Sequence, residues 1–309
     1  MHPMKACKFI LPILLAFLLL TGCSGENTPI RPVSLSEIQN GDAVWCRANG
    51  KIYYSNGGKV FSCNAAGKDT EFVCKLPRKL RKNFVTISAA TADNLIIQCG
   101  KRACNYYSLN IQTGESVLLF ENILYNSLQV LCSSDSTLFS LQKPQKANYD
   151  PILINTVREE ETVYVLSTNI DTAESELLGH ISINGGISNA DGAVSESRLF
   201  FVCKPATGMY SISLTGGDVE FILPDTQAIP EMDEVVSLEE KDGVLYMLMQ
   251  SETANPKSAL CKYDPQTNKA LPVVTIDNTF AAKNFLIDGN AYYLFDESNS
   301  LSGQLQSSY

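Results

Sequence analysis

A pattern of strand, turn and strand that recurs about every 45 residues constrains the fold of this chain more than any other feature. Six two-residue turn positions each precede a run of β-branched, aromatic or aliphatic residues. Only one of the intervals, the third, departs from the period. The second residues of the turns, spaced 44, 42, 61, 46 and 46 apart, are Gly50, Asn94, Ser136, Ser197, Gly243 and Gly289. Self-similarity at this period, with four strands per unit and no convincing helix, is typical of a β-propeller.

The best-preserved unit contains the stretch "GKIYYSNGGKVFSCNAAGKDTEFVCKL", Gly50 to Leu76. Its first hairpin turns at Asn49-Gly50, a dipeptide that accepts positive φ and favours a tight primed turn. The unit therefore predicts a four-stranded antiparallel meander, with strands at residues 43–47, 51–55, 59–63 and 71–76.

The number of blades follows from the spacing. An insertion, Lys143 to Glu160, explains the long third interval, and six four-stranded blades result. The sixth unit ends after its third strand, which would leave an unpaired edge. We therefore expect residues near Ile30 to Leu35 to pair with Leu301 to Gln306 and close the ring. Two alternatives stay open: seven blades, with one inside the insertion, and another all-β fold such as an open two-sheet sandwich.

The amino terminus has the features of an export signal. Lys5 and Lys8 precede a twelve-residue apolar core, Phe9 to Leu20, which is too short to span a bilayer as a permanent helix. The following Leu-Thr-Gly-Cys resembles the bacterial lipobox, which implies cleavage before Cys23 and acylation of that residue. Ordinary secretion, or a short buried helix in a cytosolic protein, is the alternative. The predicted divisions are a lipoprotein signal peptide at 1–22, a lipidated tether at 23–36 and a single propeller domain at 37–309.

The charge balance restricts the partners. Removing residues 1–22 leaves 287 residues and changes the formal net charge from −9 to −11, because two lysines are lost. An acidic surface disfavours nonspecific binding of nucleic acid. No further apolar run approaches the length of a membrane span. We expect a monomer outside the cytoplasm, anchored by lipid to the bacterial cell membrane.

These features together support one family resemblance. The export signal, the lipobox and the unit containing "IYYSN" resemble bacterial lipoproteins with propellers similar to the YWTD repeats of low-density-lipoprotein receptors. "IYYSN" stands where that family carries its aromatic strand motif. Members of the bacterial group mostly have no assigned activity, so the resemblance implies a surface binding or interaction role.

Residue counts exclude several kinds of chemistry. His180 is the only histidine after the signal peptide, so a Ser-His-Asp catalytic triad or a multi-histidine zinc site is disfavoured. We interpret it as a surface or packing residue in a loop, and we predict no catalytic residue, metal or cofactor. Glu159 to Glu161 and the pair Glu239-Glu240 are interpreted as solvated loop charges. Carboxylates gathered from distant blades at the channel mouth remain possible, as in glycoside hydrolysis.

The cysteines predict cross-strand disulfides. A hairpin turning at Lys68-Asp69 would place Cys63 opposite Cys74, and one turning at Lys101-Arg102 would place Cys99 opposite Cys104. Opposed residues of antiparallel strands lie within disulfide range, and export permits such bonds. The alternative is a set of buried free thiols.

One basic segment stands out against the acidic background. The run "KLPRKLRK" connects the first unit to the second, and "GKRA" forms a turn in the second unit. Both connections emerge on the same face of a propeller. The residues expected in this patch are Lys79, Arg81, Lys82, Lys101 and Arg102. They predict an anionic partner, either an envelope polymer, a lipid surface or an acidic protein.

The leading interpretation is therefore a membrane-anchored propeller that binds or scaffolds a partner on its loop face. The alternative is an envelope carbohydrate-active enzyme, a glycosidase or lyase, that uses carboxylates at the channel mouth. Convergence of carboxylates or tyrosines at that mouth, in contrast to a flat face of mixed charge, would distinguish the two.

Overall fold

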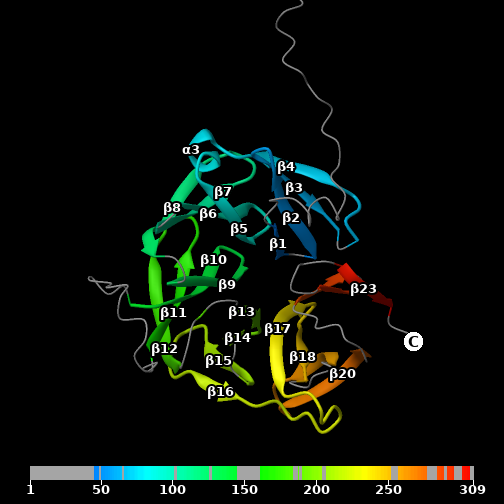
Figure 1. Ribbon diagram of the computed structural model, residues 1–309. Coiled ribbons are helices and arrows are strands. Elements are labelled where there is room, and N and C mark those ends of the chain that lie inside the picture. Colours follow the sequence, from blue (N-terminus) through cyan, green and yellow to red (C-terminus); the bar gives the residue numbers. More distant parts are fainter. Residues whose placement is uncertain are drawn as a thin grey trace, which may run out of the picture. The chain divides into compact units, whose positions relative to one another are not determined.

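The computed structural model describes most of the chain from Trp45 onward (Figure 1). The described residues are 45–48, 50–64, 66–100, 103–124, 127–144, 161–183, 187, 190–203, 207–251, 257–276, 284–288, 291–295 and 301–306. All of them belong to one compact unit, Ser34–Tyr309. None of the helices in these ranges has the length and apolar character needed to cross a membrane.

Within these residues the backbone forms six antiparallel sheets, each made of strands that follow one another along the chain. The first sheet contains β1 (Trp45–Ala48), β2 (Lys51–Asn56), β3 (Lys59–Cys63) and β4 (Glu71–Lys75). The second contains β5 (Phe84–Ala90), β6 (Asn94–Gly100), β7 (Ala103–Asn110) and β8 (Ser116–Leu124). The third contains β9 (Leu128–Ser134), β10 (Thr137–Gln142), β11 (Glu161–Asn169) and β12 (Ser175–Ile183).

The remaining sheets follow the same plan. The fourth contains β13 (Asp191–Ser195), β14 (Arg198–Val202), β15 (Met209–Ser213) and β16 (Glu220–Ile222). The fifth contains β17 (Glu234–Lys241), β18 (Val244–Gln250), β19 (Ser258–Asp264) and β20 (Lys269–Ile276). The sixth contains three strands, β21 (Asn284–Asp288), β22 (Ala291–Phe295) and β23 (Leu301–Gln306). A short helix, α3 (Arg78–Arg81), joins the first sheet to the second.

The hairpins between first and second strands turn where the sequence predicts them. Gly50, Asp135, Glu196 and Asp242 all adopt positive φ, between 49° and 69°. Two-residue hairpin loops favour this conformation because it matches the twist of the flanking strands. Local turn chemistry thus sets the boundaries of four of the six inner hairpins.

The sheets are arranged as the blades of a propeller. The first strands of successive blades are neighbours in the order β1, β5, β9, β13, β17 and β21, and they surround the centre of the ring (Figure 1). The last blade also meets the first: the Arg47 guanidinium lies 5.6 Å from the ring centroid of Phe285, and Gly50 lies against the backbone carbonyl of Ile287. The all-β propeller fold predicted from the repeats is confirmed.

A separate hydrophobic core fills the space between each blade and the blade that follows it along the chain, from the first blade to the sixth. Strand β18 shows how one blade serves two cores. Leu245, Met247 and Met249 pack against the fourth blade, whereas Tyr246 and Leu248 pack against the sixth. Side chains alternate between the two faces of a strand, and both faces are covered here. The strand therefore reads as a continuous apolar run.

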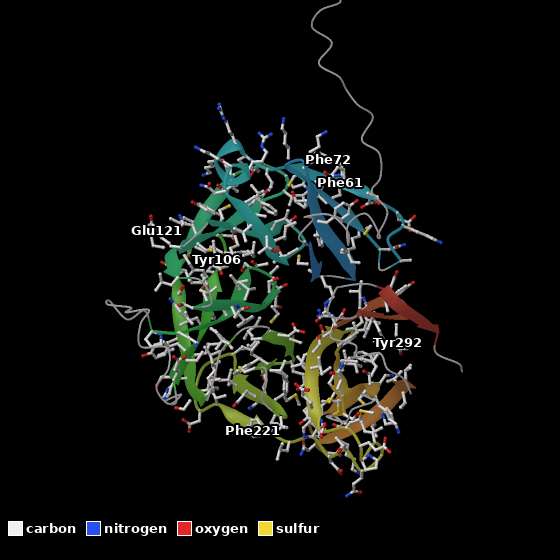
Figure 2. The ribbon with its side chains drawn as sticks, in the orientation of Figure 1. Phe61, Phe72, Tyr106, Glu121, Phe221 and Tyr292 are labelled. Atoms are coloured by element: carbon white, nitrogen blue, oxygen red, sulfur yellow. The ribbon has the colours of Figure 1, made fainter. Side chains whose placement is uncertain are left out.

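Aromatic side chains extend two of these blades toward their outer edges (Figure 2). In the first blade Phe61 lies between Tyr54 and Phe72, with ring centroids 5.6 and 5.9 Å away. In the fourth blade a similar row contains Phe201, Tyr210 and Phe221. Tyr54 of the "IYYSN" motif is fully buried, so this tyrosine serves packing.

The blade count differs from the prediction. Five blades have four strands, and the sixth sheet is a partial blade of three, because the described residues supply no fourth strand beside β23. The insertion lies between β10 and β11, as predicted, although residues 145–160 are outside the described ranges. The pairing proposed for Ile30 to Leu35 also lies outside them.

The predicted Cys63–Cys74 disulfide is wrong because of the strand register. On β3, Cys63 lies opposite Ile52 of β2, whereas Cys74 of β4 lies opposite Val60. An irregularity after Val60 shifts the register of β4. The two cysteines are therefore not cross-strand partners.

The predicted Cys99–Cys104 disulfide is also wrong, because the register of β6 and β7 differs by one residue from the register that would pair the two cysteines. Cys99 lies opposite Asn105, and Cys104 lies opposite Gly100. Because successive residues of a strand point to opposite faces, the two thiols enter different cores. All eight cysteines among the described residues are free thiols.

His180 also lies elsewhere than predicted. It is in β12, the outermost strand of the third blade, opposite Tyr164 rather than in a loop. Its side chain is exposed, which agrees with a surface role.

Candidate functional site

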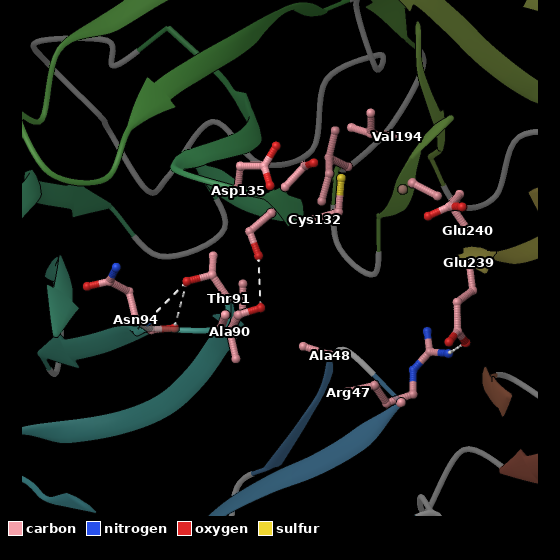
Figure 3. A pocket seen from close by; sticks show the side chains of 18 of the residues that line it. Arg47, Ala48, Ala90, Thr91, Asn94, Cys132, Asp135, Val194, Glu239 and Glu240 are labelled. Carbon is pink, nitrogen blue, oxygen red and sulfur yellow. Dashed lines mark hydrogen bonds and ion pairs between the residues drawn. The ribbon is translucent and has the colours of Figure 1, made fainter. Parts of the chain in front are cut away.

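A cavity of about 1080 Å³ lies on the axis of the ring and is lined by residues from all six sheets or their turns (Figure 3). Its lining includes Gly50, Asp93, Asp135 and Asp242. These residues belong to the turns between first and second strands, so the cavity opens at that end of the blades. We call this opening the channel mouth.

Acidic side chains dominate the lining. Seven carboxylates contribute to it: Asp93, Asp135, Asp171, Asp191, Glu239, Glu240 and Asp242. Three cations accompany them: Arg47, Lys51 and Lys241. Lys241 is 3.9 Å from Asp242, and Lys51 pairs at 3.0 Å with Glu71 outside the lining. The mouth is therefore net negative.

Arg47 links two of these carboxylates inside the channel. Its Nη2 lies 3.2 Å from Asp191 Oδ2, and its Nη1 lies 3.5 Å from Glu239 Oε2. Nη2 also donates to Ser237 Oγ at 3.1 Å. Arg47 and Glu239 approach each other from β1 and β17 (Figure 3). We call Arg47, Asp191, Ser237 and Glu239 the channel cluster.

The strand pleat explains why Arg47 enters the channel. Its neighbours Cys46 and Ala48 pack against the core between the first two blades, so Arg47 points to the other face of β1. There its guanidinium covers the Phe285 ring. A planar guanidinium can stack on an aromatic face while its N–H groups bind carboxylates, which a lysine ammonium does less well.

Asp191 is held by several donors besides Arg47. The Ser237 hydroxyl donates to its Oδ2 at 2.5 Å, and the backbone N–H of Leu238 donates to the same atom at 3.3 Å. The N–H of Gly192 donates to Oδ1 at 3.0 Å. These donors come from β1, β13 and β17, so they hold the Asp191 carboxyl in a defined orientation.

Glu239 has a different environment. Burial raises its pKa from 4.5 to about 7, against the lowering effect of Arg47, and Asp191 adds to the rise. A backbone N–H bond from Ile287 also lowers it. Near neutral pH the Glu239 carboxyl can therefore exchange a proton.

Cys132 also lines the cavity, on β9. Burial raises the pKa of its thiol far above the ordinary value, and the charge of Asp191 raises it further. Since the thiolate is the reactive form, this cysteine is a poor nucleophile at neutral pH. Among the residues that the structure describes, no group of three His, Cys, Asp or Glu side chains gathers closely enough to hold a metal ion.

The sequence-predicted basic patch lies away from this cavity. Lys79 and Arg81 are on α3 and Lys82 follows it, while Lys101 and Arg102 are outside the described residues. Cys23 is also outside them.

Sequence reasoning missed the channel cluster. The sequence predicts solvated loop charges at Glu239 and Glu240, but both lie in β17, and Glu239 is mostly buried, with 17% of its side chain exposed. A usable signal was present: Arg47, Asp191 and Glu239 each fall in the strand before a predicted inner turn, which is the strand that faces the axis.

Comparisons with known proteins identify the fold alone. No family model and no curated protein matches the sequence. A solved protein of unknown function from Bacteroides thetaiotaomicron aligns with a TM-score of 0.50 at 11% identity, over 84% of this chain and 68% of that one. An oligogalacturonate lyase from Vibrio parahaemolyticus aligns at 0.48 and 11% identity, over 87% and 75%. A gluconolactonase from Xanthomonas campestris aligns at 0.46 and 16% identity, over 83% and 82%.

Proposed function

We propose that this chain is an extracytoplasmic binding propeller, anchored by lipid at Cys23, whose channel binds a small polar ligand that carries positive charge. The acidic, water-accessible cavity on the ring axis carries this proposal. Its volume, about 1080 Å³, matches that of pockets that enclose small molecules. Charges of one sign that line a concave site concentrate ligands of the other sign.

The carboxylates of the cavity fall into two groups, those paired with Arg47 and those at the mouth. Arg47 engages two of the carboxylates, Asp191 and Glu239. The carboxylates of Asp93 and Asp135, on turns of two different blades, remain at the mouth. A ligand with two or more amino groups, such as a polyamine or an amino sugar oligomer, would contact several blades at once. Neutral sugars would lose the electrostatic part of this recognition.

Calorimetric titration with spermidine, and with glucose as a neutral probe, tests the proposal. We expect spermidine to bind and glucose not to bind. The double variant Asp93→Asn, Asp135→Asn should weaken spermidine binding about tenfold or more, since each lost charge contact contributes on the order of 1 kcal/mol. Asparagine tolerates the positive φ of Asp135, so the turn is retained.

The matched control is Asp218→Asn, an exposed aspartate outside the cavity. It should leave binding unchanged. Equal binding by the double variant and the parent chain, or binding of glucose as strong as that of spermidine, would contradict the proposal.

A carbohydrate-active enzyme is the second candidate, and one observation favours it. Asp191 and Glu239 both bind Arg47, and burial raises the pKa of the Glu239 carboxyl to about 7. A carboxyl whose pKa lies near neutral pH can act as a general acid or general base in hydrolysis. In a separate assay with an amino sugar oligomer as substrate, release of reducing ends that Glu239→Gln abolishes would favour catalysis over binding.

The proposal also includes a strand that completes the sixth blade. We propose that Ile30 to Leu35 completes it by pairing with β23. The support is the three-stranded sheet, whose outer strand would otherwise present an open edge.

A further inference from the structure

The connection around α3 carries a concentration of positive charge. Side chains tipped with nitrogen project outward around this helix (Figure 2). Six cations belong to the group, which we call the basic face: Lys59, Lys75, Arg78, Lys79, Arg81 and Lys82. All are exposed except Lys59, which is half-buried. They stand out in a chain whose formal net charge is −9.

The helix is fixed in place rather than loosely attached. Leu80 is buried, with 1% exposure, in the core between the first two blades, and its carbonyl accepts the Cys99 thiol at 3.4 Å. The stem of Arg81 lies against Gly58, and the Lys79 ammonium lies 5.9 Å from the ring centroid of Tyr107. The cations therefore hold a defined position on the propeller.

None of the ion pairs found among the described residues involves a cation of the basic face. Lys59 and Lys75 even lie directly opposite each other on β3 and β4. Like charges in opposed strand positions are destabilising. An external anionic surface would relieve this repulsion, whereas water only screens it.

The basic face and the channel mouth lie at opposite ends of the blades. Gly58, which Arg81 covers, is in the turn between β2 and β3, whereas Gly50 at the mouth is in the turn between β1 and β2. In an antiparallel meander these turns lie at opposite ends of β2. Strand β1 begins at the end that carries the basic face, since Trp45 lies opposite Tyr54, near the turn between β2 and β3.

We propose that the basic face docks on anionic phospholipid headgroups of the membrane that holds the chain, so that the channel mouth faces away from that membrane. The choice of a lipid surface rests on the lipid anchor of the proposed function. Residues 23–29, which precede the strand proposed for the sixth blade, reach at most about 25 Å when extended. Tethering at this range keeps the bilayer at high effective concentration, and a basic cluster near anionic lipids adds electrostatic attraction to the hydrophobic anchor.

The test separates docking from lipidation. The mature chain with Cys23→Ser, which has no acylation site, is mixed with vesicles of phosphatidylcholine alone or with phosphatidylglycerol added, and bound protein is measured by flotation. We expect binding only to the vesicles with phosphatidylglycerol, and loss of binding in high salt. Each cation near the surface contributes about fivefold in affinity, so Lys75→Glu, Arg78→Glu, Lys82→Glu should reduce binding more than a hundredfold.

The matched control reverses three lysines elsewhere: Lys68→Glu, Lys262→Glu, Lys269→Glu. It has the same net charge as the test variant and should keep most of the binding. Hydrogen exchange on vesicles should show protection at residues 75–84 and none at the turns that line the mouth. Equal loss in both triple variants, binding of soluble polyphosphate but not of vesicles, or protection at the mouth would overturn the proposal.

The results also distinguish docking from the proposed function. Docking of the unacylated chain does not depend on spermidine binding. Cells that produce the Cys23→Ser protein give a second test. If this protein stays in the membrane fraction, and adding Lys75→Glu, Arg78→Glu, Lys82→Glu releases it, the basic face holds the chain on the membrane by itself. If neither change releases it and vesicles are not bound, the docking proposal fails, whatever the channel binds.

Discussion

Replacing Glu239 by glutamine should stabilise the protein at alkaline pH and leave its stability unchanged at acidic pH. The pKa of Glu239 rises from 4.5 to about 7 because the carboxyl is buried, despite Arg47 beside it. Each pKa unit is equivalent to 1.36 kcal/mol, so the folded state disfavours the ionised form by about 3 kcal/mol. Glutamine resembles the protonated carboxyl and carries no such penalty.

The sign follows from proton binding. Between pH 4.5 and about 7 the folded protein binds this proton and the unfolded chain releases it. The resulting stabilisation of the parent chain is complete below pH 4.5 and is lost as the pH rises through 7. The variant lacks this dependence. Its advantage should therefore grow from about zero at pH 4.5 to about 2 to 3 kcal/mol at pH 8.

Urea unfolding followed by circular dichroism, at several values between these limits, measures the difference. Glu234→Gln, at the other end of β17, is the control and should show no growing advantage. A Glu239→Gln protein that is less stable than the parent at pH 8 would refute the reasoning. The ion pair with Arg47 would then outweigh the cost of burying the carboxylate, contrary to the balance expected for a buried pair.

Two further predictions concern the backbone and the thiols. Gly100→Ala should destabilise the protein by about 3 kcal/mol or more, because its φ is +147° and a Cβ would lie 2.1 Å from the Ala103 carbonyl oxygen. Gly114→Ala, at φ +73° with open space around it, should cost only about 1 to 2 kcal/mol in chemical unfolding. For the thiols, intact mass should be the same with and without reductant, and the eight cysteines of the domain should react with Ellman's reagent only after unfolding. A mass increase on reduction, or fast labelling of the folded protein, would show that disulfides or reactive thiolates exist.

The strands were predictable because their signals are local. The turns at Gly50, Asp135 and Asp242 need residues that accept positive φ, and such residues can be recognised in the chain itself. The apolar run of β18 follows from burial on both faces. Repetition then identified the propeller, since one blade cannot bury both of its faces alone.

The disulfide predictions were wrong because they depend on strand register, which the local sequence of a hairpin does not fix. The spacing of Cys99 and Cys104 differs from a matched pair by one residue, and that shift sends the thiols to opposite faces of the blade. The irregularity after Val60 has the same effect on Cys74. Register depends on how the neighbouring blades pack, so it was decided outside the hairpin.

The sequence by itself determined the propeller class, the order of the strands and the position of the basic run, because period-two patterning and turn chemistry act over a few residues. Only the tertiary structure decided that Arg47, Asp191 and Glu239 meet. They are separated by up to 192 positions in the chain and come from the first, fourth and fifth blades. Closure of the ring brings them to one axis, and the burial that follows raises the pKa of Glu239.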